Sequence, residues 1–373
     1  MKKSILLCVE QELSYANAPG SRMLMFYKYL KPHFFKMKLF GFKAEIVIVD
    51  ENIVCIEKKT LFSRFKLVAK ICLHLLNTNY NCIIVRGYFC GAYLCLFRMF
   101  TFKRFLILYD FHGYASHESN ICKKYILSKI IYIHEIICEY LSDFIITQNK
   151  GRAHILKSKD RDNIIIIPNG IDEDYVINNS EINVVKSKDE VWIIAVGNWG
   201  PRNNLFPIIK ALEFLPDIYK LIVIGSKCSQ YKHYVNIHEL NGKVLFLGNL
   251  SNEDTKTYLM NSNIAVVPYS ENVLFSKIKG AWSSRKIFEY MAAQLPILIT
   301  DVPGVESFME SNFNCLKYDY SSSQDITSKI IRLSFDTNLR NSIIENNNSL
   351  LPEYYWNNII CKSDLLNIIN RSY

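Results

Sequence analysis

The sequence lacks the short patterns that would assign a function directly. It contains no G-x-G-x-x-G fingerprint, which argues against a nicotinamide-dependent enzyme. It has no C-x-x-C pair and no group of Cys and His at zinc spacing, so we expect no bound metal. No uncharged apolar run approaches the roughly 18 residues that span a bilayer. The longest candidates, residues 71–85 and 87–97, are too short.

An export signal is also missing. Two lysines precede the apolar residues 5–9, but Glu10 and Glu12 end that stretch after five residues. We therefore expect no export. The 11 cysteines are odd in number and mostly lie inside apolar runs, so we expect small buried hydrophobic side chains in a reducing cytoplasm.

Charge is not spread evenly along the 373 residues. The net charge is +9, and residues 1–180 hold all of it, with 25 basic and 16 acidic side chains. Residues 181–373 hold 19 of each, whereas residues 22–104 hold 15 basic and 4 acidic ones. A basic surface on the first half of the protein could bind anionic lipid, nucleic acid or an acidic substrate. A hydrophobic content of 50% indicates a globular protein.

Short apolar runs alternate with longer amphipathic ones along the whole chain. The strand candidates are residues 4–9, 44–49, 82–85, 105–109, 144–147, 164–167, 191–196, 221–224, 244–247, 264–267 and 297–300. The helical patterns cover residues 20–31, 61–76, 91–100, 120–141, 150–158, 203–214, 253–261, 284–294 and 324–346. Uninterrupted apolar runs are typical of parallel strands buried on both faces. Strands alternate with helices once in the first half of the chain and again in the second half. This pattern predicts two doubly wound, Rossmann-like α/β domains.

Turn residues at 168–170 and the polar segment 178–190 predict a hinge near residues 170–190. The predicted domains are 1–175, which is basic, and 185–350. A last helix over 351–373 is rich in aromatic side chains at its start, so we expect it to pack back toward the first domain. Two such domains would face each other across a cleft that holds ligands at the carboxyl ends of the strands.

Two loops of the first domain carry candidate site residues. Gly20 lies where the first strand leads into a helix, and the free N–H groups there could meet an anion. A plain strand–helix turn explains this glycine equally well. His112 follows a strand beside Gly113 and could donate a hydrogen bond to a sugar hydroxyl or a reacting oxygen. The alternative is a turn histidine bonded to the backbone.

The second domain offers cations where a diphosphate could bind. Arg202 follows the strand 191–196 and precedes a helix, although an exposed arginine beside a turn is the commoner case. Ser283 or Ser284 should cap the helix that contains Lys286 and Glu289. A lysine in the first turn is disfavoured by the helix dipole, which predicts an anion at that end. A surface ion pair between Lys286 and Glu289 is the alternative.

Five segments in order resemble the landmarks of family-4-type glycosyltransferases with the GT-B fold, of the bacterial polysaccharide and lipopolysaccharide type. They are Ile167-Pro168-Asn169-Gly170-Ile171-Asp172, Ala195-Val196-Gly197-Asn198, Val244-Leu245-Phe246-Leu247-Gly248-Asn249-Leu250, Ala265-Val266-Val267-Pro268 and Lys286-Ile287-Phe288-Glu289-Tyr290-Met291-Ala292. The resemblance covers nearly the whole chain and is strongest over residues 164–306.

The resemblance implies transfer of a sugar from a nucleotide diphosphate sugar to a saccharide acceptor, with retention and without a metal or other cofactor. It implies catalytic roles for His112, Arg202 and Lys286. It implies donor contacts at Gly20, Asn198, Trp199, Gly248, Asn249, Ser283, Ser284 and Glu289, with Glu289 on the ribose. Asn198 stands where the family often has Arg, and Ala281 replaces the first Glu of its E-x7-E pattern. Lys286 could then take up the phosphate.

The basic stretches 27–42 and 61–71 mix lysines with phenylalanines, as do helices that lie on anionic membranes. A core helix with a solvated basic face is the alternative for each. We expect a lipid-linked acceptor at the inner face of the cytoplasmic membrane and no nucleic-acid partner. A sugar-nucleotide epimerase and a non-catalytic glycosyltransferase-like subunit remain alternative functions.

Overall fold

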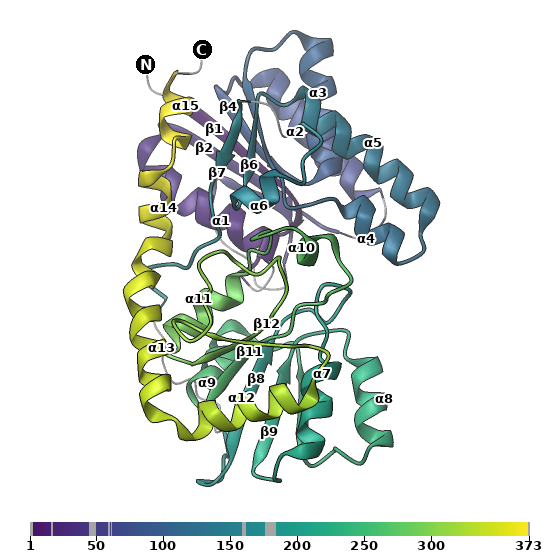
Figure 1. Cartoon of the computed structure of the whole chain (residues 1–373). Helices are drawn as coiled ribbons and strands as arrows, with labels where there is room; N and C mark the ends of the chain where they lie inside the picture. Colours follow the sequence, from purple (N-terminus) through teal and green to yellow (C-terminus); the bar gives the residue numbers. More distant parts are fainter. Residues whose placement is uncertain are drawn as a thin grey trace. The chain divides into compact units, whose positions relative to one another are not determined.

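The protein is described here by a computed structural model that covers residues 3–15, 18–44, 50–58, 60, 62–158, 162–175 and 184–371. The chain divides into two compact units (Figure 1). Unit 1 comprises Met1–Asp172 and Trp356–Tyr373, and unit 2 comprises Glu173–Tyr355. Each unit is built on one parallel sheet, which confirms the predicted α/β class with two Rossmann-like sheets.

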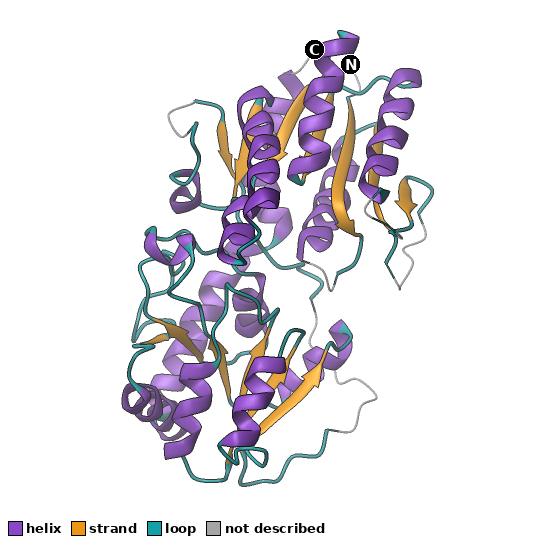
Figure 2. Ribbon diagram, turned by 90° about the vertical axis from the view of Figure 1, so that its right-hand side faces the viewer, coloured by secondary structure: helices purple, strands orange, loops and turns teal. Residues whose placement is uncertain are grey.

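Unit 1 contains a seven-stranded parallel sheet in the order β3-β2-β1-β4-β5-β6-β7. The strands are β1 (Ser4–Glu12), β2 (Lys36–Phe42), β3 (Ile53–Ile56), β4 (Cys82–Arg86), β5 (Leu106–Asp110), β6 (Phe144–Thr147) and β7 (Ile164–Ile166). All five residues of β4 are buried, because helices cover both faces of the sheet (Figure 2). The strand order reverses between β1 and β4, and in sheets of this kind ligands bind at the carboxyl ends of the strands beside such a reversal.

The helices of unit 1 come from both ends of the chain. They are α1 (Ala18–Leu30), α2 (Ser63–Asn77), α3 (Tyr88–Thr101), α4 (Ala115–Ile121), α5 (Tyr125–Leu141), α6 (Lys150–Ala153), α14 (Trp356–Lys362) and α15 (Leu365–Arg371). Helix α14 packs on α1, where the Trp356 ring lies 5.5 Å from that of Phe26. In the described part of the chain, no helix combines the length and apolar character that a bilayer crossing requires.

Unit 2 contains a six-stranded parallel sheet in the order β10-β9-β8-β11-β12-β13. The strands are β8 (Val191–Val196), β9 (Tyr219–Ile224), β10 (Val244–Gly248), β11 (Ile264–Val267), β12 (Ile297–Thr300) and β13 (Leu316–Tyr318). The helices are α7 (Phe206–Ala211), α8 (Ser229–Ile237), α9 (Asn252–Met260), α10 (Leu274–Lys277), α11 (Arg285–Ala292), α12 (Ser323–Phe335) and α13 (Thr337–Leu350). Here the strand order reverses between β8 and β11.

The basic stretch 27–42 is divided between elements of unit 1 and does not form one helix, and its expected contact with an anionic membrane stays a prediction. Its first residues end α1, and its last seven form β2. Lys36 and Lys38 alternate with buried Met37 and Leu39, which is the two-residue period of a strand with one covered face. Phe40 is 2% exposed and belongs to the core. Residues 45–49 of the predicted strand 44–49 lie outside the described residues.

Two predicted helices are each divided in the structure. The pattern over 120–141 becomes α4 and α5, separated at Lys123, whose φ of 58° is left-handed. The pattern over 324–346 becomes α12 and α13, and Asp336 between them accepts a capping hydrogen bond from the N–H of Leu339 at 3.0 Å. Both breaks are local turns inside a correctly predicted helical region.

Candidate active-site residues

The loop after β8 lies at the point where the strand order of unit 2 reverses. Its start is held by the neighbouring strand, because the N–H of Gly197 donates to the carbonyl of Ile224 at 3.0 Å. Gly225 follows β9 with a φ of +125°, and a Cβ there would lie 1.7 Å from the carbonyl oxygen of Gly197. A glycine is therefore required where these two loops cross.

Lys286, in the first turn of α11, points toward this loop. Its Nζ donates a hydrogen bond to Oδ1 of Asn203 at 3.1 Å and lies 5.8 Å and 5.6 Å from the ring centroids of Trp199 and Tyr269. Burial lowers the pKa of Lys286 to about 8. Asn203 is its one hydrogen-bond acceptor among the described residues, so its remaining N–H groups can serve an anionic ligand.

Glu306 lies at the amino end of α11, and the anionic ligand expected at that end stays a prediction. Glu306 is 4% exposed and accepts hydrogen bonds from the N–H of Ser284 at 2.9 Å and from the hydroxyl of Tyr269 at 2.5 Å. Burial raises the pKa of Glu306, whereas Lys286 lowers it. The sequence carries no signal for this residue, because an isolated glutamate in a turn-rich segment is usually solvated.

The other predicted residues of α11 differ in part from expectation. Glu289 does not form an ion pair with Lys286; it accepts from Nε of Arg285 at 2.8 Å. Its side chain is 13% exposed, so it remains partly accessible. Ser284 occupies the N-cap position, but its hydroxyl makes no capping hydrogen bond. Ser283 is half-buried just before it.

Arg202 is half-buried and lies on an aromatic cluster that also carries Lys286. Its guanidinium is 5.0 Å from the centroid of Phe275. Phe275 contacts Trp282, and Trp282 stacks on Tyr269 with centroids 4.0 Å apart and planes 1° apart. Successive contacts through these three rings therefore connect Arg202 with Lys286, which lies 5.6 Å from the centroid of Tyr269.

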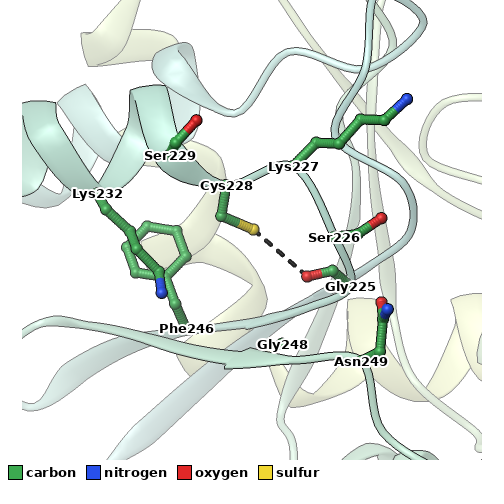
Figure 3. Close-up of a pocket in the computed structure, with 9 residues that line it drawn as sticks. All are labelled: Gly225, Ser226, Lys227, Cys228, Ser229, Lys232, Phe246, Gly248 and Asn249. Atoms are coloured by element: carbon green, nitrogen blue, oxygen red, sulfur yellow. Dashed lines mark hydrogen bonds between the residues drawn. The ribbon is translucent and has the colours of Figure 1, made fainter.

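A pocket of about 340 Å³ opens at the carboxyl ends of β9 and β10 (Figure 3). Two predicted donor residues, Gly248 and Asn249, line it together with Phe246 and the first residues of α8. Gly248 has a φ of +71° and open space around its Cα. Arg202 and Lys286 do not line this pocket. Asn198 is exposed near its neighbour Trp199, which is buried.

His112 follows β5 in unit 1 and is held by a residue that the sequence did not indicate. Arg152, 1% exposed, lies with a terminal guanidinium nitrogen 2.9 Å from Nδ1 of His112. Because arginine can only donate, Nδ1 must accept, which leaves the imidazole proton on Nε2. A neutral histidine with this tautomer can act as a hydrogen-bond donor through Nε2.

The loop before His112 is anchored by Asp110, which is 1% exposed. Burial alone would raise the pKa of Asp110, but Arg22 and Arg86 lower it below its ordinary value. Nε of Arg22 lies 3.1 Å from the carboxylate. Asp110 is thus a buried carboxylate paired with two arginines.

Gly20 has a packing role in the structure. It lies inside α1, and a Cβ there would come within 2.0 Å of the carbonyl oxygen of Glu12. Its expected contact with a diphosphate therefore stays a prediction. Within the described ranges, no group of three or more His, Cys, Asp or Glu side chains is arranged to hold a metal ion.

Comparison with known proteins identifies the second unit. Residues 177–349 match the family described as glycosyl transferases group 1. Over these residues the chain is similar to group 1 glycosyl transferases. An uncharacterized glycosyltransferase of Methanocaldococcus jannaschii is 23% identical over 216 residues, or 58% of this chain. The match spans 56% of that relative, so it covers just over half of the relative's length.

Solved structures share the fold over nearly the whole chain. Sucrose-phosphate synthase from Thermosynechococcus elongatus superposes with a TM-score of 0.75 at 14% identity, covering 99% of this chain and 98% of that one. The Anabaena protein HepE in complex with UDP-glucose gives 0.71 at 14% identity, covering 98% of each chain. The predicted resemblance to GT-B glycosyltransferases is confirmed.

Proposed function

We propose that the protein transfers a sugar from a nucleoside diphosphate sugar to a saccharide acceptor, with retention and without a metal ion. The observation that carries this proposal is Lys286, a buried ammonium with one hydrogen-bond acceptor among the described residues. Burying such a charge is unfavourable unless a ligand completes its partners. The complex of the similarly folded HepE with UDP-glucose supports a nucleotide sugar as that ligand.

The proposed roles follow from the chemistry of the leaving group. When the bond between the anomeric carbon and the β-phosphate oxygen breaks, negative charge develops on the phosphate. Arg202 and Lys286 stabilise that charge electrostatically. The acceptor hydroxyl forms the new bond on the same face and gives its proton to the departing phosphate. His112 donates its Nε2–H to the donor sugar, and Glu289 accepts from the ribose hydroxyls.

We assign the nucleoside part of the donor to the pocket beside Gly248 and Asn249. Phe246 gives this pocket an apolar wall, and the exposed Asn249 amide can both donate and accept. The pocket adjoins the loop that carries Arg202, because the N–H of Trp199 donates to the carbonyl of Ser226 at 3.1 Å. A nucleoside here would direct its phosphates toward that loop.

Ligand-induced stabilisation tests the donor proposal. We expect UDP and UDP-sugars to raise the melting temperature of the full chain by several degrees at about 100 times their dissociation constant, which corresponds to about 2.7 kcal/mol. The shift should be unchanged in excess EDTA. A shift that disappears with EDTA and returns with Mg²⁺ or Mn²⁺ would contradict metal-independent binding.

A membrane-presented acceptor is proposed from the outer face of α5. Ile126, Ile130 and Ile133 lie on one side of this helix and are 79%, 50% and 58% exposed. Lys123 and Lys129 are exposed nearby. Apolar side chains at helical spacing beside lysines are typical of a helix that rests on an anionic bilayer. A lipid-linked saccharide at that bilayer would be the acceptor.

Co-sedimentation with vesicles tests this surface. We expect the protein to bind vesicles of phosphatidylcholine with phosphatidylglycerol at low salt and to be released at high salt. Ile130→Glu should weaken binding at least about tenfold, since an inserted isoleucine contributes about 1.5–3 kcal/mol. Ile237→Glu, at a position 63% exposed on α8 of unit 2, is the matched control. Equal loss in both variants, or none in either, would exclude the α5 face.

A further inference from the structure

The carboxyl ends of β1 and β4, where the strand order of unit 1 reverses, carry a cluster of polar side chains to which the proposed sugar transfer assigns no role. Glu10, near the end of β1, is 3% exposed. One of its carboxylate oxygens accepts the N–H of Cys90 at 2.6 Å, and the other lies 3.7 Å from Nε of Arg64 in α2. A buried carboxylate is therefore positioned beneath a half-exposed arginine at the reversal point of the sheet.

A glycine makes room for the Glu10 carboxylate. Gly87, between β4 and α3, has a φ of +119°, and a Cβ there would lie 2.5 Å from the carboxyl group of Glu10. The next residue, Tyr88, accepts a hydrogen bond through its hydroxyl from Arg64 at 3.0 Å, and its ring lies 5.5 Å from the guanidinium carbon. Glu10 on β1 and Tyr88 on α3 thus both contact the Arg64 guanidinium and orient it.

The guanidinium keeps capacity for a ligand. The Arg64 side chain is 38% exposed, and Glu10 and Tyr88 are its only polar partners within the described ranges. The terminal nitrogen that faces neither of them has two N–H groups. An arginine fork of this kind matches the oxygens of a phosphate or a carboxylate.

Aromatic rings lie beside Arg64. Phe65 is 47% exposed and packs edge-on against Phe89, with ring centroids 4.7 Å apart. Phe62 is 70% exposed and 6.5 Å from Phe65. These rings provide an apolar surface on which a sugar ring or an alkyl chain can lie.

We propose that Arg64, beside the carboxyl ends of β1 and β4, binds an anionic group of the acceptor, while the adjoining apolar part of the acceptor lies on Phe62 and Phe65. This inference rests on the proposed sugar transfer and names the acceptor class, an amphiphile that carries a phosphate or a carboxylate. Glu10 and Tyr88 act as positioning residues that orient the guanidinium.

Binding of three amphiphiles to the full chain tests the proposal. The probes are decyl phosphate, decyl glucuronide and the neutral decyl glucoside, each titrated below its micelle concentration with saturating UDP present to fill the donor site. We expect at least one anionic probe to bind about ten times more tightly than decyl glucoside. The probe that does so distinguishes a phosphate-bearing lipid from an acidic sugar.

Three variants decide whether Arg64 is responsible. Arg64→Gln should abolish the preference for the anionic probe, Arg64→Lys should keep part of it, and Lys66→Gln, an exposed neighbour on α2, should leave it unchanged. A preference that survives in Arg64→Gln, or that is absent from the wild type, overturns the proposal. If Arg64→Gln does not fold, Arg64→Met replaces it, and a preference for the anionic probe that survives in Arg64→Met overturns the proposal.

The melting temperature with and without UDP is measured in parallel for every variant. The Arg64 variants should keep the full UDP shift, because they leave unit 2 unchanged. Absence of that shift in the wild type would count against the proposed donor and not against Arg64, so the two failures are distinguishable.

Discussion

Lys286→Met is expected to stabilise the ligand-free protein and to abolish its stabilisation by UDP. Burial lowers the pKa of Lys286 from 10.5 to about 8. At pH 7 the charged form of Lys286 is therefore less favourable in the folded protein than in the unfolded chain, by roughly 3 kcal/mol. Loss of the hydrogen bond to Asn203 offsets about 1 kcal/mol. Urea denaturation should therefore give a free energy of unfolding about 1–2 kcal/mol higher for the variant.

The size of this stability difference depends on pH. The unfolded chain holds the lysine proton up to about 10.5, whereas the folded protein releases it near pH 8. The wild type should thus gain stability relative to Lys286→Met as the pH rises from about 8 to 10.5, and the difference should shrink. Lys210→Met, at an exposed lysine of α7, should show neither effect. A variant no more stable than the wild type would contradict the unfavourable burial of this charge.

The same substitution should lower catalysis. A preorganised cation that meets the developing phosphate charge contributes about 3 kcal/mol to the barrier, so turnover should fall at least about a hundredfold. The measurement is release of UDP from the sugar nucleotide that gives the largest thermal shift. A variant that keeps its fold, gains stability and loses turnover would show that Lys286 serves catalysis at a cost in stability.

Arg202→Ala should also lower turnover at least about a hundredfold while the protein stays folded. Arg202 lies on Phe275 and contributes its carbonyl, not its side chain, to the backbone hydrogen bond from Ser270 at 3.0 Å. Removal of the guanidinium therefore leaves that local bond intact. The loss should fall mainly on kcat, because the phosphate charge is largest in the transition state.

Arg332→Ala provides the matched control for this experiment. Arg332 is an exposed arginine on α12, with a side chain 51% exposed, and it has no place in the proposed site. Its loss should change turnover by less than about twofold. Near-normal turnover in Arg202→Ala would remove Arg202 from the mechanism and leave Lys286 as the principal cation.

Local patterns predicted the positions of most strands because buried parallel strands are apolar throughout. The strand preceding Arg202 and the strand preceding His112 were both found in this way. Strand β2 was missed because Lys36 and Lys38 alternate with apolar residues on a partly covered strand, a pattern that also suits an amphipathic surface. This segment forms a strand because it pairs with β1, and no local sequence pattern indicates that pairing.

The partners of the candidate site residues were less predictable than the residues themselves. Lys286 was indicated by its disfavoured place in a first helical turn, but its neighbour Glu306 is 20 positions away in the sequence. Arg152 is 40 positions from His112 and decides which imidazole nitrogen carries the proton. Neither glutamate nor arginine of this kind differs in local sequence from an ordinary surface residue.

The sequence by itself determined the α/β class, the loops that carry candidate residues and the basic character of the first half. These properties depend on residue type and on the local spacing of apolar residues, both of which are contained in the sequence. Only the tertiary structure decided which charges are buried and what faces them. Burial and pairing arise when strands distant in sequence lie side by side, and they set the pKa of Lys286, the tautomer of His112 and the orientation of Arg64.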